Sequence, residues 1–298
     1  MVAERENIGP STSVDLTVEL AAGTYTLRCK PGMKGDGINS SLTVTGGAAP
    51  AASAAPRHAQ AVAKYRTYVE AQARQSLSGA KDLQAALAAG DVAKAKKLYA
   101  SSRIGWERME PVAEAFGDVD PKVDLREADL EAGQQWTGWH VIEKTLWTTN
   151  SAQGTAPVAA QLVTDLTDLV GRIGTAEITP TSMANGAKEL LDEVATGKVT
   201  GEEEAFSHTD LVDFQANVDG ARMVVDLLGP VLTEKDASLH SDLVSRFEAL
   251  QTLLARYGQN ADFVSYDKVT PAQRQELADA VDALAEPLSR VAATVVKA

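Results

Sequence analysis

The stretch HAQAVAKYRTYVEAQARQSLSGAKDLQAALAAGD, residues 58–91, decides the fold class of this chain. Apolar side chains recur along it at helical spacing, at Val62, Tyr65, Val69, Leu83 and Leu87. Gly90 is typical of a helix end, and Asp91 is placed to cap the next helix. The pattern therefore predicts a long helix from about His58 to Ala89.

The rest of the chain after this helix shows the same pattern of apolar periodicity and helix punctuation. Pro111 should kink or break the second helix, because proline cannot donate the backbone hydrogen bond of a helix interior. Further helices are expected over 91–117, 126–147, 156–173, 181–196, 207–232 and 236–257, with a last one starting at Thr270-Pro271. About eight helices joined by short loops predict a mainly α protein, an antiparallel bundle or two bundles packed together.

The N-terminal residues 1–46 show a different pattern, typical of β structure. Apolar and polar residues alternate over 14–20, and Tyr25, Leu27 and Cys29 would share one face of a second strand. Leu42 and Val44 mark a third. So few strands are marginal alone, which suggests part of a β-sandwich. A small-residue linker at 47–57 separates this segment from a helical domain at 58–298.

The composition limits the classes of function. The formal net charge of the 298 residues is −13, which disfavours binding to nucleic acid or an anionic membrane and suits a cation collector. No run of about 20 apolar residues is present that could span a membrane. The N-terminal residues lack the apolar stretch of a signal peptide. Either the protein is cytosolic, or an export signal precedes this sequence.

The segment WTGWHVIEK, residues 136–144, carries the strongest chemical signal. His140 and Glu143 are three residues apart on a predicted helix, so both side chains face the same side and can bind one ion. The alternative is an ordinary hydrogen-bonded pair. The neighbouring Trp136, Trp139 and Trp147 favour the metal site, because a charged pair beside buried aromatic rings must be compensated.

Two further acidic segments are candidates. Glu107 and Glu110 share a helical face and would repel each other unless a cation lies between them; the alternative is that both face water. Asp124 follows in the next connection, between apolar residues. Acidic runs such as 202–204 usually lie in solvated loops, although Glu203 remains a candidate ligand.

His208 lies at the start of the helix expected over 207–232, and it is a weaker ligand candidate than His140. Ser207 and Asp210 resemble a capping box at the start of this helix. His208 then fits a helix-start residue, or a group that supports a ligand, better than it fits a ligand.

Three ordered motifs, WERMEPVA (106–113), WTGWHVIEK (136–144) and SHTDLVDFQANVDG (207–220), closely resemble EfeO-type proteins. These are iron-binding components of the EfeUOB uptake system, with an imelysin-like, peptidase-like helical domain. The resemblance covers about 58–298. It implies that His140 and Glu143 form a His-x-x-Glu metal motif, with Glu107, Glu110 and Asp124 around the same site and Glu203 as a further ligand.

Longer family members also carry an N-terminal cupredoxin domain, and residues 23–33 resemble its closing strands. Cys29 and Met33 stand where a cupredoxin places soft metal ligands, but the usual histidine partners are absent here. The chain thus resembles a family member that begins inside this domain. The resemblance further implies an extracytoplasmic location, periplasmic or at the cell surface, and a membrane-anchored lipoprotein in the full-length form.

The expected ligand set favours iron. One imidazole with several carboxylates is a hard, anionic set that suits ferric iron, whereas zinc sites usually contain more nitrogen or sulfur; zinc or copper could still bind. The resemblance implies delivery to a membrane permease, with a peroxidase-like partner. A carrier without enzymatic activity is therefore expected. The alternatives are a zinc-dependent peptidase with Glu143 as general base, and an adhesion or scaffold domain without metal.

Overall fold

The computed structural model describes residues 20, 23–29, 37–45 and 55–297. Among these residues, eight helices have eleven residues or more, which confirms the mainly α class. They are α1 (Ala55–Ala88), α2 (Val92–Met109), α4 (Trp139–Thr149), α5 (Thr155–Arg172), α6 (Pro180–Thr196), α7 (Asp210–Lys235), α8 (Ala237–Leu254) and α9 (Pro271–Leu288). Two shorter helices are α3 (Asp120–Val123) and α10 (Val291–Val296). None of the described helices is long and apolar enough to cross a membrane.

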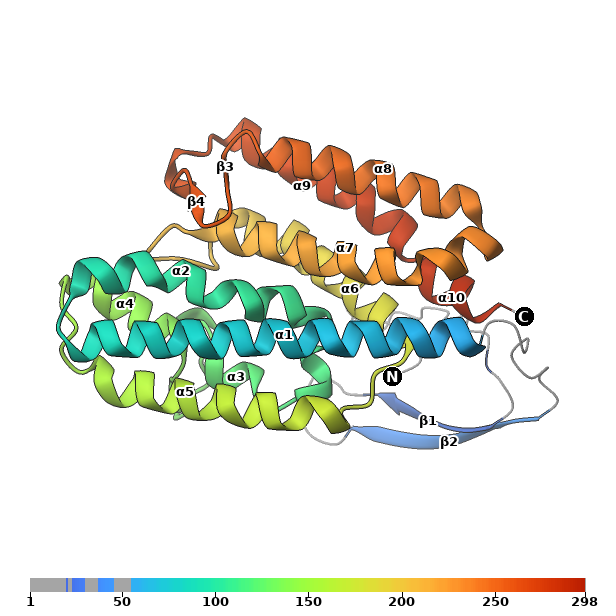
Figure 1. The fold of residues 1–298 in the computed structure, drawn as a ribbon, viewed down its shortest axis with the longest axis horizontal. Helices are drawn as coiled ribbons and strands as arrows, with labels where there is room; N and C mark the ends of the chain where they lie inside the picture. Colours follow the sequence, from blue (N-terminus) through green and yellow to red (C-terminus); the bar gives the residue numbers. More distant parts are fainter. Residues whose placement is uncertain (1–19, 21–22, 30–36, 46–54, 298) are drawn as a thin grey trace.

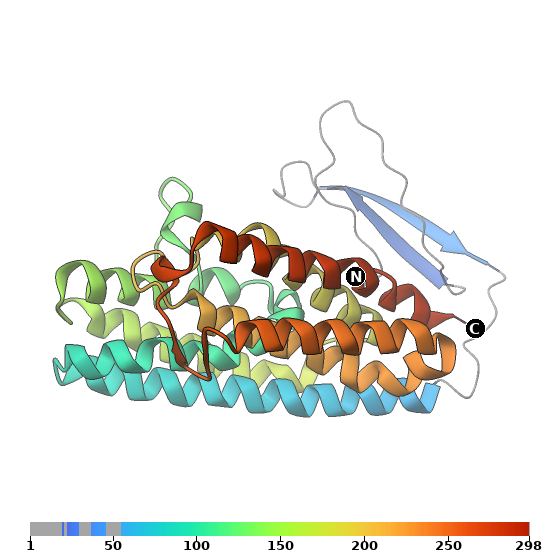
Figure 2. The ribbon, with the colours of Figure 1, turned by 90° about the horizontal axis from the view of Figure 1, so that it is seen from above.

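The long helices lie in two groups that pack side by side (Figures 1 and 2). The first group contains α1, α2, α4 and α5, and the second contains α6, α7, α8 and α9 with α10 at one end. Helix α2 packs against α7 and joins the groups, and one continuous apolar core runs through both. The two-bundle alternative from the sequence therefore describes the molecule.

Helix α7 can approach α2 closely because Gly220 has no side chain. A Cβ at Gly220 would lie 2.4 Å from the carbonyl oxygen of Arg108, which is closer than any side chain tolerates. Asp213, Asn217 and Gly220 are spaced four and three residues apart, so they share the face of α7 that meets α2. This approach places two polar side chains of α7 beside the buried carboxylates of α2.

Local sequence signals set several of the helix ends. Asp91 accepts a hydrogen bond from the backbone of Lys94, as its capping role predicted, at 3.0 Å. Thr270 and Gln273 form a reciprocal capping box at the start of α9. Pro111 ends α2 as expected, and the chain continues as the 3-10 helix η2 (Glu110–Phe116).

Two of the predicted helices begin later in the chain than expected. The helix expected over 126–147 is wrong in its first half, because α4 starts only at Trp139 after a 3-10 turn, η3 (Glu127–Asp129), and a loop. Gly133 and Gly138 in this loop have φ values of 84° and 88°, which a helix does not allow. The capping box expected at Ser207 is also absent, since α7 begins at Asp210 with Thr209 as its cap residue.

The N-terminal region contains two of the three expected strands. Strands β1 (Gly23–Cys29) and β2 (Ile38–Val44) pair antiparallel, with Tyr25 opposite Leu42, and Cys29 is exposed. Residues 14–19 of the expected first strand, and Met33, lie outside the described residues. Helix α1 starts inside the predicted 47–57 linker.

Candidate metal centre

The centre is built on the buried face of α2. Tyr99, Arg103, Trp106 and Glu107 recur at helical spacing and are all fully buried. A buried guanidinium is costly unless anions surround it. The charged groups of the centre are therefore arranged around Arg103.

Arg103 contacts five carboxylates from four segments of the chain. Its closest partners are Asp124, Glu107 at 2.6 Å and Glu204 at 2.8 Å. Glu203 and Asp213 lie at 3.3 and 3.4 Å. The carboxylates lower the desolvation cost of the guanidinium and raise the pKa of Arg103 well above its ordinary value against the effect of burial. Arg103 therefore acts as a fixed positive centre for the acidic groups.

His140 bridges two carboxylates from the first turn of α4. Its Nε2 lies 3.3 Å from Oδ1 of Asp124, and its Nδ1 lies 3.2 Å from Oε2 of Glu143. Burial and Arg103 lower the pKa of His140, but the hydrogen bonds to the two carboxylates outweigh both effects and raise the pKa to about 9. The imidazole of the metal-free protein is therefore protonated at neutral pH.

Glu143 connects His140 to the segment between α6 and α7. This segment, residues 197–209, is the α6–α7 loop. Oε1 of Glu143 accepts hydrogen bonds from the backbone N–H groups of Phe206 and Ser207, at 2.9 and 2.7 Å. Burial raises the pKa of Glu143, but the hydrogen bonds from His140 and from these two N–H groups lower it overall. The carboxylate therefore stays ionised and holds the loop over the centre.

A second cation, Lys198, comes from the same loop. It belongs to the 3-10 turn η5 (Lys198–Thr200) and is 2% exposed. Its Nζ lies 2.9 Å from Oε2 of Glu107 and 3.0 Å from Oε2 of Glu110. Asn217 donates to the same two carboxylates, at 3.0 and 2.7 Å. The expected repulsion between Glu107 and Glu110 is thus relieved by a lysine and an amide.

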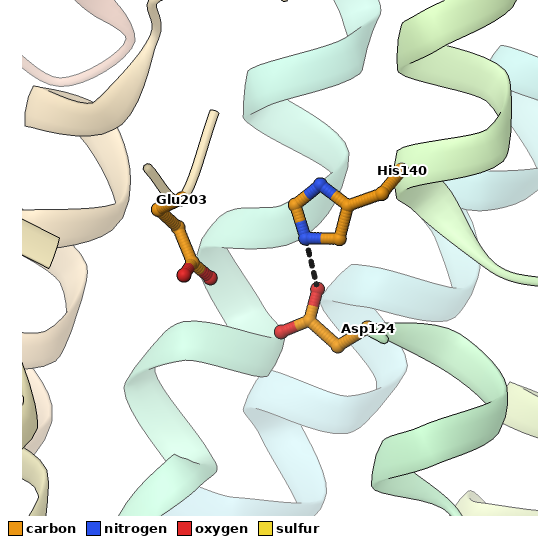
Figure 3. Close-up of side chains that lie close together, drawn as sticks. All are labelled: Asp124, His140 and Glu203. Atoms are coloured by element: carbon orange, nitrogen blue, oxygen red, sulfur yellow. Dashed lines mark ion pairs between the residues drawn. The ribbon is translucent and has the colours of Figure 1, made fainter. Parts of the chain in front are cut away.

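Within the described part of the chain, three overlapping groups of side chains could hold a metal ion. Each group offers ligand atoms that all lie within 4.8 Å of one another: Asp124, His140 and Glu203; His140, Glu143 and Glu204; and Glu107, Glu110 and Asp124. In the first group, Glu203 from the α6–α7 loop faces the His140–Asp124 pair from the opposite side (Figure 3). Asp124 and His140 each belong to two groups, so the three sets of ligands converge on one buried region.

The centre is short of positive charge. Eight buried or nearly buried carboxyl groups lie around three buried cations, Arg103, Lys198 and His140, and one partly exposed cation, Arg126, which pairs with Glu203 at 3.4 Å. The eight belong to Glu107, Glu110, Asp124, Glu143, Glu203, Glu204, Asp210 and Asp213. Burial raises the pKa values of Glu110, Glu204 and Asp213 well above their ordinary range. Protons therefore neutralise part of the charge that a bound cation could neutralise instead.

Buried oxygen atoms without partners point to the same shortage. Oδ2 of Asp210, Oδ2 of Asp213 and Oδ1 of Asn217 have no hydrogen-bond partner among the described residues. Buried polar atoms are nearly always satisfied in folded proteins. Unsatisfied acceptors beside a ring of carboxylates are what a site for a cation would leave.

The six candidate ligands from the sequence all lie in this region. Glu107, Asp124, His140 and Glu143 are buried, Glu110 has a side chain that is 14% exposed, and Glu203 is 4% exposed. The three groups do not place Glu143 together with Glu110. His208, expected at a helix start, lies in the α6–α7 loop with a φ of 57° and belongs to none of these groups.

Sequence reasoning missed five buried polar residues of the centre: Arg103, Lys198, Glu204, Asp213 and Asn217. Acidic runs such as 202–204 usually lie in solvated loops, and this expectation is wrong for Glu204, which is fully buried; Glu203, a candidate ligand from the sequence, is buried as well. The sequence contains one indication of the role of Arg103, because Arg103 precedes Glu107 by four residues and lies on the same helical face as Trp106. The sequence contains no such indication for Lys198, because its two closest partners, Glu107 and Glu110, are 91 and 88 residues away.

The fold and this centre define a class of protein: a mainly helical two-bundle protein with a buried cluster of carboxylates around one histidine. A sequence profile of the imelysin family matches residues 61–291, and the chain belongs to this family. The resemblance to EfeO-type proteins is confirmed.

Two relatives illustrate the similarity to known proteins. An "Efem/EfeO family lipoprotein" of Staphylococcus haemolyticus is 44% identical over 237 residues, which cover 78% of this chain and 83% of that protein. The "Iron uptake system component EfeO" of Escherichia coli is 40% identical over 299 residues, covering 98% of this chain and 78% of the relative. The similarity to the second relative therefore includes the N-terminal β segment.

Proposed function

We propose that this chain is the iron-binding component of an EfeUOB-type uptake system outside the cytoplasm. Iron would be held as cargo by the groups around His140. The observation that carries the proposal is the convergence of three overlapping carboxylate and histidine groups in one region short of positive charge. The names of the relatives, an iron uptake system component and a lipoprotein, support both the cargo and the location.

Ferric iron suits this set of ligands. The first group supplies two carboxylates and one imidazole, and the neighbouring groups add carboxylates only. Such oxygen-rich, anionic sets favour hard cations of high charge, although zinc or copper could compete in vitro. All six candidate ligands come from residues 107–203 of the helical part. Residues 1–54 would thus contribute little to this site.

Binding requires the protons of the metal-free centre to leave. A metal ion takes the neutral imidazole of His140 and ionised carboxylates, so loading would release protons. Acid would return these protons and weaken the site. A protein that captures and then delivers its cargo needs this kind of reversible coordination. Delivery would be to a membrane permease, with a peroxidase-like partner in the same system.

A titration with ferric ion, supplied as ferric nitrilotriacetate, tests the proposal. The wild-type chain should bind a single ferric ion. H140A should lose at least about 100-fold in affinity, because loss of a group that only supports a ligand already costs about 10–100-fold. H240A is a matched control because His240 contacts Thr233 and belongs to none of the candidate groups. Equal affinities of wild type and H140A would contradict the proposal.

A zinc-dependent peptidase is the second candidate, because the same groups could hold a catalytic ion. A peptidase needs an ion with an open position and a free general base. Here Glu143 is occupied by His140 and by two backbone N–H groups. Peptide cleavage should therefore be absent with zinc or iron. A cleavage activity that E143Q abolishes without loss of metal affinity would favour the peptidase.

A further inference from the structure

Lys198 places a positive charge between candidate ligands of the proposed site. Its Nζ lies 2.9 Å from Glu107, 3.0 Å from Glu110 and 3.6 Å from Glu203. An ammonium is a compact cation with three donors, and here it meets three carboxylates. A metal ion bound by Glu107 and Glu110 would need the space and the carboxylate oxygens that this ammonium uses.

We propose that Lys198 is a resident counter-cation that an incoming metal ion displaces from Glu107 and Glu110. The inference rests on the proposed function, since it assigns to one residue the control of metal affinity at that site. In the metal-free protein, Lys198 keeps the buried carboxylates from facing each other uncompensated. When the ion arrives, its charge replaces that of the ammonium.

The other buried cation, Arg103, is not suited to this exchange. Its planar guanidinium is held by five carboxylates at once, and it stands on the rigid helix α2. Each contact would have to break for the guanidinium to leave. Lys198 has a single Nζ on four flexible methylene groups, so a change of side-chain rotamer is enough to move its charge.

The movement should involve the side chain of Lys198 and not the backbone of its turn. The Tyr266 hydroxyl donates to the carbonyl of Val199, and Arg274 donates to the carbonyl of Thr200 at 3.0 Å. These contacts hold the turn against α9 and against the 3-10 turn η6 (Tyr266–Lys268) that precedes it. Glu193 offers a destination, because it is exposed, precedes Lys198 by five residues and acts electrostatically on its ammonium.

Such an exchange moderates the affinity of the site. A metal ion must compete with Lys198 as it binds, and the ammonium can return as the ion leaves. The buried carboxylates are then never left without a cation, a state that costs several kcal/mol in a protein interior. A carrier that must release its cargo gains from this competition.

The test compares K198M with wild type, and with K188M as a matched control. Lys188 lies on α6, ahead of the same loop, but pairs with Asp192 where both side chains are partly exposed. Methionine keeps the length of the side chain and removes the charge. In ferric titrations, K198M should bind ferric ion about tenfold more tightly than wild type. A change of this size lies within the usual range for the coupling of two binding events. The ferric affinity of K188M should equal that of wild type. The metal-free K198M should melt at a lower temperature.

The outcomes separate this inference from the proposed function. If the wild type binds no ferric ion, the proposed function fails. If the wild type binds and K198M binds equally or more weakly, only the role of Lys198 is overturned. If K198M does not fold, a crystal structure of the ferric-loaded wild type decides: Nζ should have left Glu107 and Glu110. An ammonium still bonded to both beside the bound ion would overturn the inference.

Discussion

Gly138 lies so close to the backbone of Val123 that a Cβ at this position would stand 2.1 Å from the Val123 carbonyl oxygen. The close approach brings the first turn of α4 against the end of α3. Asp124 follows Val123, and His140 is two residues after Gly138, so the two side chains of the His140–Asp124 pair are placed together. Gly138 thus positions two candidate ligands that it does not touch.

G138A should therefore damage both stability and the metal site. The φ of 88° costs about 1–2 kcal/mol for a residue with a Cβ, and the clash with Val123 adds to this. We expect a loss of about 3 kcal/mol or more in the free energy of unfolding, measured with urea, and weaker ferric binding. G133A is a matched control, because Gly133 has a φ of 84° but open space around it. Equal losses in both variants would contradict the role of the close approach.

The pH dependence of the metal-free protein should report the charge on His140. Its pKa is raised from 6.5 to about 9 by the fold, so protonated His140 stabilises the folded state. This stability is fully present below pH 6.5 and is lost as the pH rises through about 9. The shift corresponds to about 3 kcal/mol.

Urea unfolding of wild type and H140Q at several pH values measures this contribution. The difference in unfolding free energy between the two proteins should shrink between pH 6.5 and 9. H240Q is the control and should follow the wild type. A constant difference between wild type and H140Q across this range would show that His140 is not charged in the folded protein.

Helical periodicity and punctuation in the sequence predicted most of the fold. Asp91, Pro111 and Thr270 each act as expected, because caps and helix breakers work over three or four residues. The late start of α4 could not be predicted in the same way. Gly133 and Gly138 prevent a helix here because both have positive φ values. Gly138 is also needed because the carbonyl oxygen of Val123 approaches it closely, which the sequence does not show.

The candidate centre shows the same limit. His140 and Glu143 could be paired from the sequence because a single helix turn brings them together. The surroundings of Arg103 could not, because its partners Asp124, Glu203 and Asp213 are 21, 100 and 110 residues away. An acidic run such as 202–204 usually lies in a solvated loop, and nothing within the run indicates that it is buried here. Only the packing of the two bundles decides between these alternatives.

R103M should be severely destabilised in the metal-free protein. Removal of the guanidinium leaves Asp124, Glu107 and Glu204 without their closest cation in a buried environment. Breaking a buried ion pair from one side costs about 3–5 kcal/mol, and we expect at least this loss in urea unfolding. R108M is the control, because Arg108 pairs with Asp219 and both side chains are partly exposed. A loss in R103M no larger than in R108M would refute this expectation.

Lys144 should control how fast the metal ion exchanges, because it links the α6–α7 loop to the elements around α4. Its Nζ lies 5.6 Å from the ring centres of both Trp136 and Phe206, and it pairs with Glu127. Phe206 belongs to the loop that Glu143 holds over the centre. A cation–π interaction at a partly exposed position contributes about 0.5–1 kcal/mol. K144M should therefore leave global stability nearly unchanged but let the loop open more often.

Release of ferric ion to an excess of chelator, followed by stopped-flow absorbance, measures this effect. We expect K144M to release the ion about three- to fivefold faster than wild type, since about 1 kcal/mol of closure energy corresponds to a factor of this size. K96M is the matched control, because Lys96 lies in a similar way over Trp147, 5.3 Å from its ring centre, and bonds to Asn150 away from the loop. A release rate in K144M equal to those of wild type and K96M would show that the contact of Lys144 with Phe206 does not control release, because Glu143 would then hold the loop without it.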